Sequence, residues 1–492
     1  MESDLCTNRL RHWAFAVVFI LLGILFFTTI RDGHDWGGDF SIYVQEARNI
    51  ADHRAFNQSS YVPTMESMRN HPAVYPPMTA LLLAPIYAID GLNYKAFKTT
   101  LTMLLWLSTT FYYVLGLRHG LPPGVAALLV LVFGLSPLVM AVKQTVGSDS
   151  AFLFFAGLTL VVLDEIYRRG WDERYSLLAG SVTACLLILC YLTRAIGLAL
   201  IVGFVGYEIW RVRRLRRFGL VAMGLTAIVL IVYATFVFHL GRQYGTQFVF
   251  QPRVYAANAL EYLRTPAALW GAAPRLVRYP LSAAVIVLGV IGFIRSFSKA
   301  TVAEFYFIAW MAVLIPYWVS DMRYMLPLLP LVLIYAASGL LLVANNLLLS
   351  GLSRKVFLVT CGVAVVASSA VNVRAVETGP IREGIAKPTF GEVCAFLRSQ
   401  TPANSLILSW NPRVFALYTG KQSALYPQSS TPADFDRDIP RQGPIFLVFY
   451  NHELDREKLT PYLSQTGPRI VFDNKEFLVF AISTVTITEI QK

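Results

Sequence analysis

Residues 13–39 read WAFAVVFILLGILFFTTIRDGHDWGGD, an apolar run that ends abruptly in a cluster of Asp, His and Gly. The run from Trp13 to Ile30 contains no charged residue. Because a helix of about 20 residues crosses roughly 30 Å of hydrocarbon, this run predicts a membrane span. Arg9 and Arg11 precede it and no small-residue cleavage site follows, which is typical of an uncleaved signal anchor.

The composition of the whole chain is that of a membrane protein. Of its 492 residues, 55% are hydrophobic and 15% are charged, whereas about 25% are charged in soluble proteins. The net charge is +12, but the basic residues lie in short loops between apolar runs. That placement is typical of topology determinants and lipid contacts, and it argues against a nucleic-acid-binding groove.

Ten further apolar runs follow the first. They lie at 96–117, 125–142, 151–166, 177–189, 196–210, 218–238, 280–294, 302–319, 325–343 and 356–373. Together the runs predict an α-helical polytopic membrane protein with about eleven transmembrane helices. The sequence leaves open whether the hairpin around Tyr191–Arg194 crosses fully.

Lys and Arg are distributed unevenly between alternate loops. One set of loops carries clusters such as the five arginines within 211–217, and the short loops of the other set carry the single cations Lys143, Arg194 and Arg323. Since Lys and Arg in short loops favour the cytoplasm, this bias predicts a cytoplasmic N-terminus and an extracytoplasmic C-terminus.

The predicted organisation is a membrane domain at 1–373, with extracytoplasmic loops at 31–95 and 239–279, followed by a soluble extracytoplasmic domain at 374–492. Within the last segment, 390–400 has the pattern of a helix. Alternating apolar runs at 405–409, 444–450, 469–472 and 476–482 predict strands. The C-terminal segment is therefore expected to be a small α/β domain.

The loop after the first span contains a second helical pattern. Apolar residues at Phe40, Tyr43, Val44, Ala47 and later positions form one stripe, which predicts a short amphipathic helix lying in the membrane interface. Asp39 stands at its start, where an N-cap is an alternative to a functional role. Further on, the segment His71 to Pro77 predicts a turn that opens another apolar helix.

Several short motifs, taken in order, resemble the GT-C glycosyltransferases, in particular the branch with the aminoarabinose transferases and protein O-mannosyltransferases. The motifs are Gly38-Asp39 before the interfacial helix, Tyr75-Pro76-Pro77 leading to Gly91-Leu92, Gly147-Ser148-Asp149, Leu192-Thr193-Arg194, Asp321 to Pro327 and, in the tail, Pro412 to Gly420. Each motif is weak alone, but together they cover nearly the whole chain.

The resemblance implies an inverting transferase that takes a sugar from a polyprenyl phosphate. Such chemistry needs a carboxylate near the acceptor hydroxyl and cations near the leaving phosphate. By matching motifs, the implied catalytic residues are Asp39 and Asp149. For Asp149 the alternative is a helix N-cap, since Ser148-Asp149 precedes an apolar run. The implied phosphate-binding residues are Arg323, Arg194 and Lys143, and the implied pocket residues are His71, Tyr75 and Tyr324.

The resemblance leaves a metal open. Many relatives carry paired acids in the first loop, whereas Phe40 follows Asp39 here and the nearest other acid is Asp35. Asp39 remains a candidate ligand for a divalent cation. No nucleotide or redox cofactor is expected, because the sequence lacks a Gly-rich phosphate loop.

Rival functions are a transporter or lipid flippase, a non-catalytic scaffold, and a polymerase or ligase that uses diphosphate-linked glycans. Transporters usually place ionisable residues in mid-span, whereas the acids here cluster at the predicted outer face. The partners that the resemblance implies are a polyprenyl-phosphate sugar, a lipid, glycan or protein acceptor and membrane lipids. The expected location is a bacterial inner membrane.

Overall fold

The computed structural model describes residues 12–64, 75–237, 248–347, 351–426, 443–450 and 468–482. The chain divides into two compact units. One comprises Met1–Ile30, Lys98–His239 and Gln247–Thr378, and the other comprises Arg31–Phe97, Leu240–Thr246 and Gly379–Lys492. The second unit thus combines the first loop with the tail.

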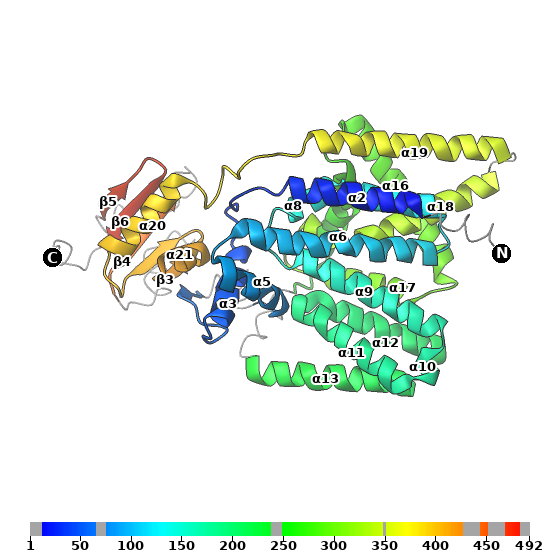
Figure 1. The fold of residues 1–492 in the computed structure, drawn as a ribbon, viewed down its shortest axis with the longest axis horizontal. Helices are drawn as coiled ribbons and strands as arrows, with labels where there is room; N and C mark the ends of the chain where they lie inside the picture. Colours follow the sequence, from blue (N-terminus) through cyan, green and yellow to red (C-terminus); the bar gives the residue numbers. More distant parts are fainter. Residues whose placement is uncertain are drawn as a thin grey trace. The chain divides into compact units, whose positions relative to one another are not determined.

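The first unit is a bundle of helices (Figure 1). Its helices are α2 (Trp13–Thr28), α6 (Tyr94–Arg118), α7 (Pro123–Gly134), α8 (Pro137–Val142), α9 (Asp149–Arg168), α10 (Trp171–Arg174), α11 (Ser176–Thr193), η1 (Ala195–Gly197), α12 (Leu198–Val212), α13 (Arg217–Val237), α15 (Pro252–Arg264), η3 (Thr265–Trp270), α16 (Arg275–Phe297), α17 (Val302–Leu314), η4 (Met322–Met325), α18 (Leu329–Leu347) and α19 (Gly351–Arg374).

Each of the predicted apolar runs falls on helical segments in the part of the chain that the structure describes. Seven described helices are long and apolar enough to cross a membrane, namely α6, α9, α11, α13, α16, α18 and α19. Helices α2, α7 and α17 are apolar but shorter. The chain is therefore a helical polytopic membrane protein, as predicted.

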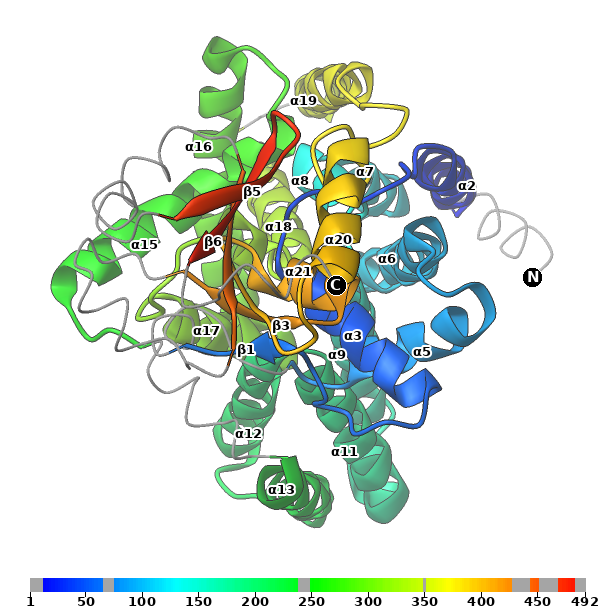
Figure 2. The ribbon, with the colours of Figure 1, turned by 90° about the vertical axis from the view of Figure 1, so that its left-hand side faces the viewer.

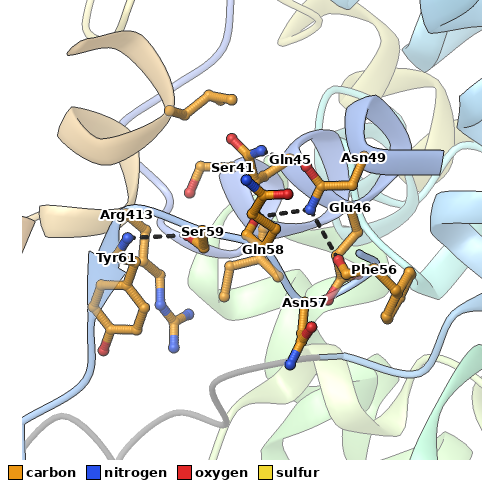
Figure 3. A pocket seen from close by; sticks show the side chains of 12 residues that line it. Ser41, Gln45, Glu46, Asn49, Phe56, Asn57, Gln58, Ser59, Tyr61 and Arg413 are labelled. Carbon is orange, nitrogen blue, oxygen red and sulfur yellow. Dashed lines mark hydrogen bonds between the residues drawn. The ribbon is translucent and has the colours of Figure 1, made fainter. Parts of the chain in front are cut away.

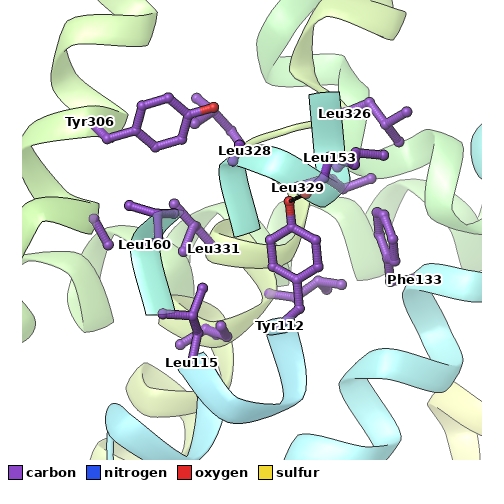
Figure 4. Close-up of a cluster of buried hydrophobic side chains, with 14 of the residues drawn as sticks. Tyr112, Leu115, Phe133, Leu153, Leu160, Tyr306, Leu326, Leu328, Leu329 and Leu331 are labelled. Carbon is purple, nitrogen blue, oxygen red and sulfur yellow. Dashed lines mark hydrogen bonds between the residues drawn. The ribbon is translucent and has the colours of Figure 1, made fainter. Parts of the chain in front are cut away.

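Buried leucine and aromatic side chains fill the centre of this bundle (Figure 4). Phe133, Leu153 and Leu329 are 2%, 0% and 0% exposed, and the Tyr112 hydroxyl donates to the carbonyl of Leu153. Helices α16 and α18 approach closely at a glycine. A Cβ built on Gly292 of α16 would lie 1.8 Å from the Tyr335 carbonyl oxygen of α18. Small residues let membrane helices approach in this way.

The second unit contains a six-stranded mixed sheet flanked by helices (Figure 2). Its elements are α3 (Asp39–Ala51), β1 (Tyr61–Val62), α5 (Met78–Asp90), α20 (Pro388–Gln400), β2 (Leu406–Ser409), α21 (Pro412–Thr419), β3 (Gln422–Leu425), β4 (Ile445–Tyr450), β5 (Arg469–Asp473) and β6 (Phe477–Ile482). The strand order is β1-β3-β2-β4-β6-β5, parallel from β1 to β4 and antiparallel at β6 and β5.

The first loop contributes an edge strand and a core residue to this unit. Strand β1 pairs in parallel with β3, with Tyr61 opposite Ser423 and Val62 opposite Ala424. The Trp36 ring packs among aromatic side chains of the tail, 5.3 Å from the Phe390 ring centroid. The α/β arrangement predicted for the tail therefore includes residues from the start of the chain.

The amphipathic helix predicted after Asp39 is present as α3. Its apolar stripe is covered by protein, however, because Phe40, Tyr43, Val44 and Ala47 are at most 4% exposed. The stripe packs against α5 and the tail helix α21. The prediction that this stripe rests on a lipid surface is wrong, since other helices of the same unit already bury it.

Candidate active site

Asp39 is the first residue of α3, and the N-cap is Gly38. The alternative that Asp39 serves as an N-cap is wrong, because helix α3 has no side-chain cap hydrogen bond. Its carboxylate oxygen Oδ1 instead accepts a hydrogen bond of 2.6 Å from the Tyr75 hydroxyl. A carboxylate in the first turn of a helix is favoured by the helix dipole, and this one is 37% exposed.

Arg413, from the tail helix α21, also contacts Asp39. Its Nη1 atom lies 3.5 Å from Asp39 Oδ1 and 3.5 Å from the Tyr75 hydroxyl oxygen. The guanidinium carbon lies 5.2 Å from the Tyr61 ring centroid and 5.9 Å from that of Tyr75. With 6% of its side chain exposed, Arg413 is a buried cation held by one carboxylate and two aromatic rings.

Tyr75 is fixed between these groups. Its ring stacks on Tyr43 with centroids 4.8 Å apart. Burial, and then the negative charge of Asp39, raise the pKa of the Tyr75 hydroxyl. The phenol therefore keeps its proton at neutral pH and acts as a donor to Asp39.

Glu46 lies two turns further along α3 and is 3% exposed. Its Oε1 accepts a hydrogen bond of 3.0 Å from the backbone N–H of Tyr75. Burial raises the pKa of the Glu46 carboxyl, against the opposing effects of this hydrogen bond and of Arg413. Burial thus favours the protonated form of this side chain, which supports the segment carrying Tyr75.

His71 lies outside the described residues. Among the residues that are described, no group of three or more His, Cys, Asp or Glu side chains is placed to hold a metal ion. The surroundings of Asp39 do not fit a divalent cation, because its Oδ1 already accepts a hydrogen bond from a phenol and forms an ion pair with a guanidinium.

A second cluster lies in the helical unit around Asp149. Asp149 is the first residue of α9, the N-cap is Ser148, and helix α9 also has no side-chain cap hydrogen bond. The N-cap alternative is wrong here too, because the Asp149 carboxylate forms an ion pair with Arg194. Both side chains are largely buried, at 6% and 15% exposed.

Tyr324 lies between the two arginines predicted to bind phosphate. The guanidinium carbon of Arg194 is 5.6 Å from the Tyr324 ring centroid, and that of Arg323 is 5.9 Å from it. Arg323 Nε also lies 3.4 Å from Asp321 Oδ2. The structure thus gathers Asp149, Arg194, Tyr324 and Arg323 from α9, the α11–η1 junction and η4.

Lys143 ends the short helix α8 and is 1% exposed. Its ammonium donates to the carbonyl oxygen of Thr29 at 2.7 Å. A buried ammonium bonded to a backbone carbonyl ties α8 to the end of the first span, which is a structural role in addition to the predicted phosphate contact.

Sequence reasoning did not single out Arg413 or Glu46. Arg413 belongs to the quoted tail motif, and it is a cation within a helix whose other residues are mostly buried. That signal points to a buried ion pair but does not name a partner hundreds of residues earlier. Glu46 lies outside the predicted apolar stripe and outside the quoted motifs, so no sequence signal singles it out.

No protein-family model and no curated protein matches the sequence. Solved structures match over nearly the whole chain. ArnT from Cupriavidus metallidurans in the apo state is 13% identical, with a TM-score of 0.58, over 95% of this chain and 98% of that one. The same protein has also been solved bound to undecaprenyl phosphate.

Two other glycosyltransferases share the arrangement. The oligosaccharyltransferase AglB from Archaeoglobus fulgidus, in complex with an inhibitory peptide and a dolichol-phosphate, is 12% identical with a TM-score of 0.57, over 98% of this chain and 75% of that one. The arabinofuranosyltransferase AftD from Mycobacteria is 14% identical with a TM-score of 0.55, over 96% of this chain and 40% of that one. The chain therefore has the GT-C glycosyltransferase fold, as the resemblance predicted.

Proposed function

We propose that this protein is a membrane glycosyltransferase that moves a sugar from a polyprenyl-phosphate donor to a hydroxyl of a lipid, glycan or protein acceptor. The observation that carries the proposal is Asp39, an accessible carboxylate whose Oδ1 is held by Tyr75 and Arg413. The similarity to ArnT and AglB, which were solved with undecaprenyl phosphate and dolichol-phosphate, supports this class of donor.

In the proposed reaction, the acceptor oxygen attacks the anomeric carbon from the face opposite the lipid phosphate, so the configuration inverts. A carbon–oxygen bond forms while the bond to the phosphate oxygen breaks, and the phosphate leaves with the electron pair. Asp39 takes the hydroxyl proton. A positioned base of this kind contributes about 10²–10⁴-fold to the rate.

Arg194 and Arg323 are the proposed ligands of the lipid phosphate, since charge-assisted hydrogen bonds stabilise a departing anion. Asp149 is already bound to Arg194. We therefore assign Asp149 the role of the counter-ion of Arg194, which the lipid phosphate would displace, rather than of a second base. Tyr324, beside both arginines, would orient them through its ring.

The proposed location is the bacterial inner membrane, with the reaction on the extracytoplasmic face. The uneven distribution of Lys and Arg between loops supports this orientation.

The test compares envelope lipids and glycans with and without the gene by mass spectrometry. Wild type should restore one missing sugar modification, and Asp39→Asn should reduce it about 100-fold or more. Asp52→Asn, at the other end of α3 and paired with Arg48, is the matched control and should restore it fully. Full restoration by Asp39→Asn would refute Asp39 as the base.

A transporter or flippase is distinguished with purified protein. A transferase forms a new glycosidic bond when donor and acceptor are mixed in detergent, where no membrane separates two compartments. A flippase has no product under those conditions.

A further inference from the structure

A polar pocket lies beside the Asp39 cluster in the second unit (Figure 3). Helix α3 contributes one wall, the loop after it contributes the rim, and α21 contributes the opposite side. The lining residues are Ser41, Ile42, Gln45, Glu46, Asn49, Phe56, Asn57, Gln58, Ser59, Tyr61, Arg413 and Leu417. The pocket is a shallow depression, and the 360 Å³ of empty space at its lining residues includes the adjoining open solvent.

The wall of this pocket is internally braced. Gln45 Nε2 donates to Asn49 Oδ1 at 2.9 Å, and Asn49 Nδ2 donates to the carbonyls of Phe56 and Gln58 at 2.9 and 2.7 Å. These bonds hold the loop against α3 without a ligand. A pre-formed pocket loses less entropy when it binds.

Glu46 supplies the observation that points to a ligand. Its Oε1 is satisfied by the Tyr75 N–H, but among the described residues its Oε2 has no hydrogen-bond partner. A buried polar atom without a partner is costly, and a ligand hydroxyl entering the pocket would satisfy it.

The charge of the pocket lining does not call for an anionic ligand. Its only ionisable lining residues are Glu46, Tyr61 and Arg413, and Arg413 is already paired with Asp39. Asn and Gln amides both donate and accept, as sugar hydroxyls do. The Tyr61 and Phe56 rings provide apolar surface for the C–H face of a sugar ring.

The pocket also continues from the proposed base. Asp39, Ile42, Glu46 and Asn49 follow the spacing of one helical stripe, and seven residues of helix span about 10 Å. Arg413 both lines the pocket and contacts Asp39.

We propose that this pocket is the subsite for a neutral, hydroxyl-rich part of the acceptor, a sugar ring, held by Glu46 and the amides of α3 and its loop. The identification of this ligand as the acceptor rests on the proposed glycosyl transfer. Binding to the pocket itself can be tested without a donor.

The experiment uses the full-length protein in nanodiscs, free of sugar detergents, and ligand-observed NMR with methyl glycosides of hexoses and pentoses as probes. Glucose 1-phosphate is the charged comparison. Asn57→Trp fills the rim, Glu46→Leu removes the buried carboxyl, and Glu46→Gln keeps an acceptor for Tyr75 and adds a donor. Gln400→Ala, an exposed change at the end of α20, is the matched control.

We expect at least one neutral glycoside to bind wild type, Gln400→Ala and Glu46→Gln, and binding to fall about fivefold or more in Asn57→Trp and Glu46→Leu, as one lost hydrogen bond predicts. Thermal unfolding of each variant separates lost binding from lost folding. A second removal of the same rim contact, Asn57→Phe, should reproduce the Asn57→Trp result if Glu46→Leu does not fold.

The proposal is overturned if no neutral glycoside binds wild type, if Asn57→Trp binds as well as wild type, or if only glucose 1-phosphate binds. Because this assay needs no donor, its failure is separable from failure of the proposed function. If a neutral glycoside binds but gene deletion changes no envelope lipid or glycan, the transferase function is refuted and the binding pocket stands. If gene deletion removes a sugar modification but no neutral glycoside binds, only the pocket proposal is refuted.

Discussion

The pKa of Glu46 depends on its tertiary surroundings rather than on its neighbours along the chain. Burial raises the pKa of its carboxyl above the ordinary 4.5. The folded protein therefore keeps a proton that the unfolded chain releases, and the free energy of unfolding falls as pH rises above 4.5 until Glu46 ionises.

The Gln side chain of Glu46→Gln cannot ionise, so this variant should not show the fall in the free energy of unfolding with rising pH. As pH rises above about 4.5, the free energy of unfolding of wild type should fall relative to that of Glu46→Gln by up to about 1.4 kcal/mol per pH unit, and its thermal unfolding midpoint should fall with it. Differential scanning fluorimetry of both proteins across this range measures the difference. Parallel curves would show that Glu46 is ionised in the folded state.

The Asp149–Arg194 pair predicts opposite effects for its two members. If the carboxylate competes with a lipid phosphate for the guanidinium, Asp149→Asn should tighten binding of undecaprenyl phosphate. Arg194→Gln should weaken binding about tenfold or more, the loss of one charge-assisted hydrogen bond. Native mass spectrometry or a lipid-binding titration measures both. Equal weakening by the two changes would mean that Asp149 itself contacts the donor.

At the scale of elements, α16 and α18 approach so closely that position 292 of α16 has no space for a methyl group. Gly292→Ala places a Cβ 1.8 Å from the Tyr335 carbonyl oxygen, whereas Gly289→Ala, one turn earlier, meets Val332 O at 3.8 Å, an ordinary contact. Overpacking costs about 1–3 kcal/mol. Gly292→Ala should lower the temperature at which the detergent-solubilised protein aggregates, and Gly289→Ala should leave that temperature unchanged. Equal aggregation temperatures for the two variants would show that the helices can separate at little cost.

The sequence could predict elements where local pattern decides them. Long apolar runs became helices, and α20, β2, β4, β5 and β6 start within two residues of their predicted positions. Strand β1 has only two residues, too few for an alternating pattern, and β3 is a short strand with a polar start. Both depend on pairing with distant segments, which no local pattern encodes.

The candidate site divides in the same way. Asp39 and Tyr75 were found because they lie in short motifs, but Arg413 was not, since its carboxylate partner stands far away in the sequence. The N-cap alternatives for Asp39 and Asp149 failed because tertiary partners, Tyr75 and Arg194, take the carboxylate oxygens. Glu46 was not predicted either, because its burial depends on segments that are distant in the sequence.

At the scale of the whole molecule, the charge bias of the loops predicts which ends face the cytoplasm. In a chain whose native cysteines are replaced by serine, Asp52→Cys should react with an impermeant maleimide on intact cells. Arg169→Cys, at the end of α9 and 56% exposed, should react only after permeabilisation. The reversed pattern would place Asp39 on the cytoplasmic side and refute the proposed reaction there.

Because β1 and Trp36 come from the first loop while the rest of their sheet lies in the tail, the ribosome makes these partners at opposite ends of translation. Strand β1 and the Trp36 indole therefore have no tail partners until nearly every span has been inserted. Long-range pairing of this kind is slow and exposes the nascent chain to proteases and chaperones. A prematurely terminated product would keep Asp39 but never acquire Arg413, so incomplete chains lack the assembled carboxylate cluster.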